Sequence, residues 1–243
     1  MRGECSPKLN SVRNFDVDRA DRFQSQTMNA FRLHDAARRN DLTEVERILA
    51  QKDADLNRGE GRGWTPLHFA VFQGFEKVAA LLVNKGADPN QASHGGRTPL
   101  HHAAMRGYEK MVALLVNAGA DLNQVTCNRF TPLHCAAYSG YEKVVALLIK
   151  AGADLHKPCN DGWTPLDLAT QNGHTQIVTL LQQGMRKQEH CRLVSLASLL
   201  KPIDLPILVV YKIYCAVPLY KNNAVSRFDT WRVLTAIKQC EKF

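Results

Sequence analysis

A four-residue phrase, Thr-Pro-Leu-His, returns through the chain at a fixed interval of 33 residues. It begins at Thr65, Thr98 and Thr131, and a variant that ends in aspartate begins at Thr164. A fixed period of this length is typical of stacked repeats, in which each unit is too small to bury its own apolar face. The period therefore favours a row of similar modules over a fold with one central core.

Each copy of the phrase predicts the start of a short helix. Threonine is favoured just before a helix, where its side-chain oxygen accepts a hydrogen bond from an unpaired backbone N–H. Proline fits the first helical turn, where its missing N–H is not needed. A glycine follows seven residues after each leucine of the phrase and predicts the helix end, because glycine adopts the left-handed conformation at low cost. These glycines are Gly74, Gly107, Gly140 and Gly173.

A second helix is predicted directly after each of these glycines. Apolar residues recur there with the period of one buried helix face. They are Val78, Ala79, Leu81 and Leu82 in one copy, Val112, Ala113 and Leu115 in the next, and Val144, Val145, Leu147 and Leu148 in the third. Turn-forming residues then occupy 90–96, 123–129 and 157–162, which predicts an outward-pointing hairpin. Each unit is thus expected to be a helix, a second helix and a hairpin.

This arrangement resembles the ankyrin repeat. The resemblance rests on the phrase, on the glycines and on a later Gly-Ala-Asp that begins at Gly86, Gly119 and Gly152. It implies an all-α repeat solenoid, an ankyrin array of helix-helix-hairpin units over about residues 29–184. We expect five repeats, at about 29–61, 62–94, 95–127, 128–160 and 161–184. We interpret residues 1–28 as a flexible leader and residues 185–243 as a basic and apolar C-terminal extension.

The first and the last repeats depart from the common pattern. In the first, Phe31-Arg32 replaces Thr-Pro, Asn40 stands where glycine is expected, and one additional residue is placed within 41–44. In the last, Gln182 occupies a place that is apolar in the other copies. Terminal repeats commonly differ because one of their faces meets water. These two repeats are therefore predicted to be the caps of the array.

The repeated histidines His68, His101 and His134 could suggest a metal site or a catalytic array. The ankyrin resemblance implies a structural role instead, in which each histidine forms hydrogen bonds between neighbouring repeats. A zinc site from Cys127, His134 and Cys135 is a weaker candidate, because these residues lack the usual spacing of ligand pairs. We therefore predict no bound metal and no cofactor.

The seven cysteines form an odd number and include no Cys-x-x-Cys pair, which favours free thiols in a reducing compartment. We expect an intracellular, cytoplasmic protein, with the nucleus as an alternative. The sequence also contains no phosphate-binding loop, no nucleophile flanked by glycines and no paired His-Glu motif. It is therefore predicted not to be an enzyme.

The resemblance implies that a protein partner binds the concave surface, which hairpin tips and first helices form in ankyrin arrays. The family's variable contact positions carry over to residues that precede each threonine or lie at the exposed end of each first helix. They are Arg62, Trp64, Phe72, Arg97, Met105, Arg106, Arg129, Phe130, Tyr138 and Trp163. Tryptophan, tyrosine and arginine dominate the binding energy of many interfaces. A monomeric protein-protein interaction scaffold is therefore the leading hypothesis.

Two of these candidates also have a structural interpretation, and a third, Arg129, stands at an unusual position. Trp64 and Trp163 could pack only against their own hairpins. Arg129 stands where the other full repeats have glycine, which is costly for a side chain if the turn there is left-handed. A residue kept at such a cost points to a function.

The C-terminal extension carries most of the positive charge. Residues 185–243 contain ten basic and four acidic residues, +6 of the formal net charge of +8. A second protein or an anionic membrane surface is therefore expected to bind the extension and not the nearly neutral array. The basic residues are dispersed and no groove-reading motif is present, which argues against nucleic acid. Pro206, Lys212 and Pro218 interrupt the apolar run 205–220, so we expect no transmembrane helix there.

Two alternative functions depend on this extension. Cys191-Arg192-Leu193-Val194 with Leu205-Pro206 resembles the suppressor-of-cytokine-signalling box, which would make the protein a substrate receptor of a ubiquitin ligase. Lys187 and Ser195 depart from that pattern. The other alternative is an ankyrin effector that an intracellular microbe delivers into the host cytosol, with the extension as its secretion or membrane-targeting signal.

Overall fold

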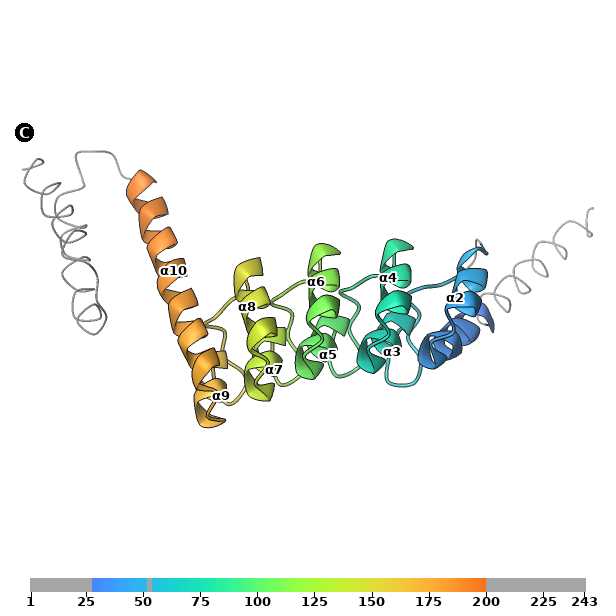
Figure 1. The fold of residues 1–243 in the computed structure, drawn as a ribbon, viewed down its shortest axis with the longest axis horizontal. Helices are drawn as coiled ribbons and strands as arrows, with labels where there is room; N and C mark the ends of the chain where they lie inside the picture. Colours follow the sequence, from blue (N-terminus) through green and yellow to red (C-terminus); the bar gives the residue numbers. More distant parts are fainter. Residues whose placement is uncertain (1–27, 52–53, 200–243) are drawn as a thin grey trace, which may run out of the picture. The chain divides into compact units, whose positions relative to one another are not determined.

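The structure is a computed structural model that describes residues 28–51 and 54–199, with side chains up to residue 188 (Figure 1). Within these residues all regular structure is helical, apart from an isolated bridge between Glu60 and Trp64. The chain divides into two compact units, Met1–Gly184 and Met185–Phe243. The prediction of an all-α repeat array is confirmed within the first unit.

The helices of the array come in pairs that follow one another along the chain. The pairs are residues 28–39 with α2 (Leu42–Leu49), α3 (Pro66–Gln73) with α4 (Glu76–Asn84), α5 (Pro99–Arg106) with α6 (Glu109–Asn117), α7 (Pro132–Ser139) with α8 (Glu142–Ala151), and α9 (Pro165–Gln171) with α10 (Thr175–Leu199). The helices α3, α5, α7 and α9 pack in sequence against one another, and so do α2, α4, α6 and α8 (Figure 1). The array is therefore two layers of helices, one of first helices and one of second helices.

The first helices begin as the repeated phrase predicts. Thr65, Thr131 and Thr164 lie in extended backbone, and each hydroxyl accepts a hydrogen bond from the backbone N–H three residues later. The donor-acceptor distances are 3.4, 3.3 and 3.3 Å, respectively. Each of these helices starts with the proline that follows the threonine.

The glycines that end the first helices meet two requirements at once. Gly74 has a φ of 81°, which is the left-handed conformation expected at a helix end. A ring from the next repeat, Tyr108, also lies over it, so that a Cβ on Gly74 would come within 3.0 Å of the ring. Tyr141 covers Gly107 in the same manner. The glycine thus leaves room for the neighbouring repeat as well as for the turn.

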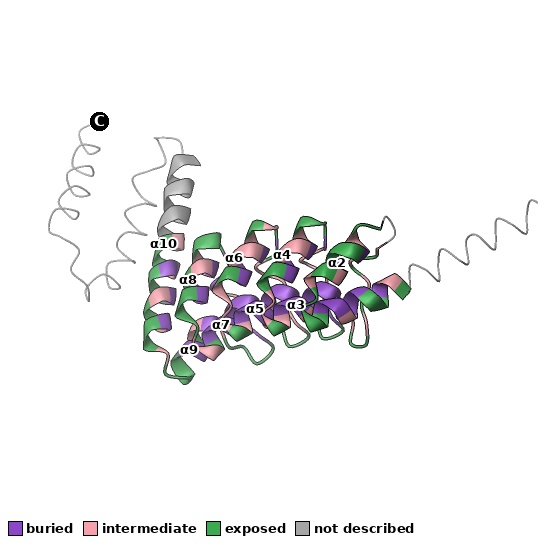
Figure 2. Cartoon of the chain, turned by 45° about the vertical axis from the view of Figure 1, so that its right-hand side comes forward, coloured by how far each residue is buried: buried purple, intermediate pink, exposed green. Residues whose placement is uncertain are grey.

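The apolar core lies between the two layers of helices, where the buried residues gather in Figure 2. The buried residues of the second helices are Val78, Ala79 and Leu82 in α4, Met111, Val112 and Leu115 in α6, and Val144, Val145 and Leu148 in α8. The predicted stripe is confirmed at its centre but is narrower than expected. Leu81, Ala113 and Leu147 are only half-buried, because they lie at the edges of the stripe.

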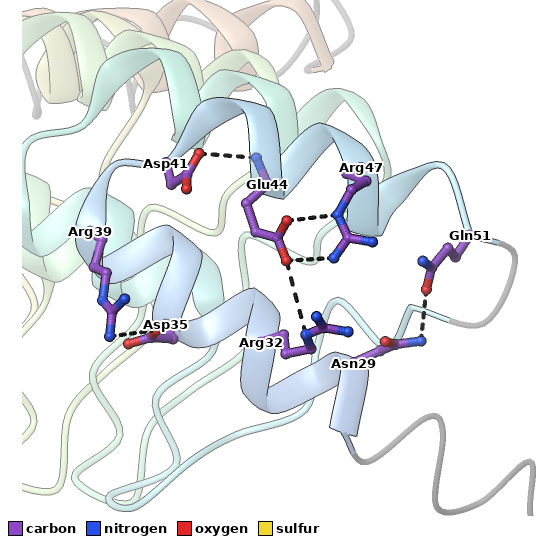
Figure 3. A network of polar contacts seen from close by, with 8 residues as sticks. All are labelled: Asn29, Arg32, Asp35, Arg39, Asp41, Glu44, Arg47 and Gln51. Atoms are coloured by element: carbon purple, nitrogen blue, oxygen red, sulfur yellow. Dashed lines mark hydrogen bonds and ion pairs between the residues drawn. The ribbon is translucent and has the colours of Figure 1, made fainter.

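The first repeat presents a polar surface at its end of the described array (Figure 3). Asp41 caps α2 by accepting a hydrogen bond from the backbone N–H of Glu44 at 3.0 Å, which is the main reason that the pKa of Asp41 is lowered. Glu44 in turn accepts hydrogen bonds from Nε and Nη2 of Arg47, each at 2.7 Å, and these lower the pKa of Glu44. Such a charged, internally paired surface fits the predicted cap.

The additional residue of the first repeat does not lie within residues 41–44, as the sequence suggested. α2 keeps the spacing of α4, because buried Val45 comes four positions after the N-cap Asp41, as a buried residue does in α4. Asn57 and Asn90 are again equivalent, since each side-chain oxygen accepts a backbone hydrogen bond from the next repeat, at 2.8 and 2.7 Å. The additional residue therefore lies in the loop after α2.

The helix α10 continues past Gly184, where the fifth repeat was expected to end, and includes residues 191–199. Gly184 is buried, and a Cβ there would lie 3.0 Å from side-chain carbons of Ile149 and Leu155. This glycine therefore serves close packing and does not stop the helix. No helix among the described residues is long and apolar enough to cross a membrane. The predictions for residues 1–27 and 200–243 lie outside the described residues.

Candidate binding surface

The hairpins between the repeats stack edge to edge. Each tip is closed by a backbone hydrogen bond, for example from Ser93 N to Arg97 O at 2.9 Å. Neighbouring tips are joined by backbone hydrogen bonds from His94 N to Arg62 O, from Cys127 N to Gly95 O and from Asn160 N to Asn128 O. We call the surface of the hairpin tips and the exposed sides of α3, α5, α7 and α9 the inner face, and the exposed sides of α4, α6 and α8 the outer face.

The repeated histidines connect each first helix to the hairpin of the next repeat. In His68, Nδ1 lies 2.8 Å from Oγ1 of Thr65, and Nε2 lies 2.9 Å from the carbonyl oxygen of Arg97. A carbonyl only accepts, so Nε2 carries the proton and donates it. His101 and His134 donate in the same way to Phe130 O at 3.0 Å and Trp163 O at 3.2 Å. Their predicted structural role is confirmed.

These histidines are held in the neutral form. Burial lowers the pKa of His68 and His134, and it lowers the pKa of His101 to about 4. In the last repeat Asp167 replaces the histidine. It keeps the contact with the threonine of its own phrase, because its Oδ2 accepts hydrogen bonds from N and Oγ1 of Thr164 at 2.8 and 2.6 Å. A carboxylate has no N–H to donate, and the chain has no sixth Thr-Pro phrase whose hairpin could receive one.

An aromatic cluster joins the second and third repeats on the inner face. The ring of Trp64 lies 5.1 Å from Phe72, 5.1 Å from Phe69 and 4.9 Å from His102, measured between ring centroids. The guanidinium carbon of Arg106 lies 4.2 Å from the centroid of the Phe72 ring. The structure thus brings three candidate residues together: Trp64, Phe72 and Arg106. Trp64 is half-buried and contacts α3 and α5, and not only its own hairpin as the structural interpretation had it.

The sequence analysis missed His102, which lies in the middle of this cluster. Its ring is 1% exposed, and neither ring nitrogen has a hydrogen-bond partner among the described residues. Burial lowers its pKa to about 3, and the positive charges of Arg97 and Arg106 add to this effect. Alignment of the repeats could have revealed it, because the equivalent positions in the second, fourth and fifth repeats hold the apolar residues Phe69, Cys135 and Leu168. A histidine in this series is therefore expected to be buried.

Most of the candidates fall into two rows along the inner face. One row precedes the threonines and consists of Trp64, Arg97, Phe130 and Trp163; the other lies near the ends of the first helices and includes Phe72, Met105 and Tyr138. Tyr138 and Trp163 are 57% and 40% exposed, so these two rings have most to gain from a partner. Phe72, Met105 and Phe130 are half-buried.

The four candidate arginines are exposed to solvent. They are Arg62, Arg97, Arg106 and Arg129. In the described part of the chain, none of them forms an ion pair with a carboxylate. Arg129 also has a φ of 59°, at the place where Gly63, Gly96 and Gly162 are left-handed. The predicted backbone cost at Arg129 is therefore present.

The described thiols and imidazoles do not assemble into a metal site. Among residues 28–51 and 54–199, no group of three or more His, Cys, Asp or Glu side chains could hold a metal ion. Cys127, Cys135 and Cys159 are free thiols, and burial raises the pKa of Cys135 to about 11. Both ring nitrogens of His134 are engaged in hydrogen bonds.

Comparison with known protein families agrees with this geometry. A family model described as ankyrin repeats matches in three overlapping copies, at residues 33–126, 86–158 and 120–190. The chain belongs to the ankyrin repeat family. Ankyrin repeats generally mediate protein-protein interactions and are typically not enzymes. No curated protein matches the chain.

The ankyrin match ends at residue 190 and does not cover residues 191–243 of the C-terminal extension. The resemblance of residues 191–194 and Leu205-Pro206 to a suppressor-of-cytokine-signalling box stays a prediction. The effector hypothesis also stays a prediction, as does a second partner or an anionic membrane surface at the extension.

Proposed function

We propose that this ankyrin protein is a non-enzymatic, monomeric scaffold that binds a protein partner on its inner face, the concave surface of the array. One observation carries the proposal: exposed aromatic rings share the inner face with arginines that form no ion pair within the described part of the chain. On the outer face, Lys110 and Lys143 pair with glutamates of the preceding repeat. We place the protein in the cytoplasm, where its free thiols would stay reduced.

The energetics of interfaces support this choice of face. Binding energy concentrates in a few aromatic and arginine side chains that become fully buried in the complex. Tyr138 and Trp163 are exposed rings on a rigid array, so a partner gains their burial without ordering a loop. In the second repeat, Trp64 and Phe72 are already packed together and offer a preformed apolar patch on the same face.

A comparison of two tyrosines tests the proposal. Tyr138 is 57% exposed on the inner face, whereas Tyr141 packs its ring over Gly107 at the turn before α8. We expect Tyr138→Ala to weaken partner binding by about 1–3 kcal/mol with an unchanged melting temperature. Tyr141→Ala should lower the melting temperature and leave the affinity of the folded protein unchanged.

Site-specific photo-crosslinking identifies the face and supplies the partner for that measurement. A benzophenone amino acid at Tyr138 or Trp163 should give one discrete protein adduct in a cell lysate, and the same group at exposed Ala146 of α8 should not. Equal adducts from both faces would contradict the proposal. So would a partner that binds a fragment of residues 185–243 as tightly as it binds the full chain.

A further inference from the structure

We infer that the inner face binds an acidic segment of its partner in an extended conformation, with carboxylates on the arginines of successive repeats. The inference rests on the proposed function and specifies the chemistry of the partner. It follows from the distribution of charge, from the absence of ion pairs between these arginines and the described carboxylates, and from the spacing of the repeats.

The charge of the inner face is positive where the array is most regular. In the third and fourth repeats the hairpins and first helices occupy residues 89–108 and 122–141. These segments contain Arg97, Arg106 and Arg129 and no aspartate or glutamate. Acidic residues return in the flanking repeats, at Glu60, Asp161 and Asp167. The positive potential is therefore concentrated at the centre of the inner face.

These arginines are available to a ligand. Other arginines of the array are neutralised locally, since Arg38 and Arg39 pair with Asp35 at 2.9 and 3.0 Å. The guanidinium of Arg106 lies on the Phe72 ring, and stacking of this kind leaves the N–H edge open for the two oxygens of a carboxylate. Arg129 keeps its side chain at a left-handed position that glycine fills in the other repeats.

The spacing of the repeats sets the conformation of the bound segment. Neighbouring helices pack with their axes about 8–10 Å apart, so successive hairpins are about this far apart. An extended chain rises by about 3.3 Å per residue, and three residues cover about 10 Å. A helix would need about six or seven residues for the same distance. An extended segment with an acidic residue at about every third position therefore suits Arg62, Arg97 and Arg129, which belong to successive hairpins and stand three, one and two residues before the threonine, respectively.

Peptide selection tests the inference directly. A displayed library of random peptides of about 12 residues would be selected on the full chain. We expect Asp and Glu to be enriched with a spacing of three, and selected peptides to bind about tenfold more weakly when one carboxylate is replaced by its amide. The affinity should also fall steeply with salt.

Charge-matched variants of the two faces provide the control. The triple variant Arg97→Gln, Arg106→Gln, Arg129→Gln should lose the acidic enrichment. The triple variant Lys77→Gln, Lys110→Gln, Lys143→Gln removes the same charge from α4, α6 and α8 and should keep it. Circular dichroism verifies the fold, and the single variant Arg129→Gln is used if the inner triple variant does not fold.

Three outcomes would overturn the inference. The first is a selection that shows no enrichment of Asp and Glu. The second is an equal loss of this enrichment in the outer triple variant. The third is a twelve-nucleotide oligo(U) RNA that binds more tightly than the selected peptides. If Tyr138 still crosslinks to a partner while any of these outcomes is found, the proposed function is supported and only the inference of an acidic segment is contradicted. Loss of both the crosslink and the enrichment would remove both proposals.

Discussion

The inner and outer faces of the array come from the same repeats but use charge differently. On the outer face, Lys110 Nζ lies 3.5 Å from Oε2 of Glu76, and Lys143 Nζ lies 3.2 Å from Oε1 of Glu109. Each pair joins one second helix to the next. On the inner face the exposed arginines have no such partner among the described residues. The outer pairs thus join neighbouring repeats by charge, whereas the inner arginines form no such pair among the described residues, and Arg106 contacts the preceding repeat through the Phe72 ring.

The inner face also contains the features that cost stability. His102 is buried without a hydrogen-bond partner among the described residues, and Arg129 has left-handed backbone. Each feature destabilises a fold by about 1–3 kcal/mol unless something else compensates. Both costs lie in the hairpins and first helices, whereas the second helices have neither feature among the described residues.

The largest expected effect belongs to the core that both faces share. Leu115 of α6 is fully buried, so Leu115→Ala should lower the free energy of unfolding by about 2–5 kcal/mol through a cavity. Leu114→Ala, a half-buried neighbour on the same helix, should cost clearly less. Urea unfolding measures both losses. Equal losses would contradict the assignment of the core to the space between the layers.

Lower pH should act on the inner face through its histidines. The pKa values of His101 and His102 are lowered to about 4 and about 3 by burial, from 6.5, so the unfolded chain binds protons first. Stability should therefore be full above about pH 6.5 and fall as the pH drops, by up to about 1.4 kcal/mol per unit for each histidine. Urea titrations between pH 7 and 4.5 measure this slope while most carboxylates stay ionised.

The variant His102→Leu tests the cost assigned to this ring. Leu168 occupies the equivalent buried place, so leucine should fit, remove the unpaired nitrogens and stabilise the protein by about 1–3 kcal/mol at pH 7. The pH slope should become shallower. The outer variant Lys110→Gln should leave the slope unchanged. A destabilised His102→Leu protein would mean that the ring serves the array.

Much of this fold could be predicted from the sequence because its determinants are local and repeated. Threonine, proline and glycine at fixed offsets fix the ends of the first helices, and Thr65 and Gly74 behave as their chemistry requires. The His68 hydrogen bond to the next hairpin followed from the family resemblance. Errors appeared where the period breaks, at the loop after α2 and at Gly184, since packing against Ile149 and not the repeat pattern places that glycine.

The sequence predicted which positions belong to the candidate surface, but it did not predict the contacts between their side chains. The sequence gives Trp64 and Trp163 the same register, yet only Trp64 has a neighbouring aromatic cluster and Trp163 stays 40% exposed. That difference depends on side chains from the adjacent repeat, His102 above all. The lack of ion pairs at the arginines is also a property of three-dimensional distances, which no spacing in the sequence shows.

A smaller effect is expected at Arg129, where stability and binding should oppose each other. Arg129→Gly removes a side chain from a backbone with a φ of 59° and should raise the free energy of unfolding by about 1 kcal/mol. The same change should weaken partner binding. Arg129→Gln keeps the backbone cost and removes the charge, so it should weaken binding without a gain in stability. A loss of stability in Arg129→Gly would show that this arginine holds the hairpin.

The smallest effect is expected for the outer pair of Glu109 and Lys143. Its atoms are 3.2 Å apart, but the side chains are 44% and 78% exposed, so water screens the attraction and ordering two flexible side chains offsets part of it. A double-mutant cycle with Glu109→Gln and Lys143→Gln should give a coupling below about 0.5 kcal/mol, and about 0.5 M salt should reduce it further. Partner binding should not change in any of the three variants, because the pair lies on the outer face. A coupling free energy above about 1 kcal/mol would mean that this exposed pair stabilises the array more than expected. A loss of partner binding would contradict the assignment of binding to the inner face alone.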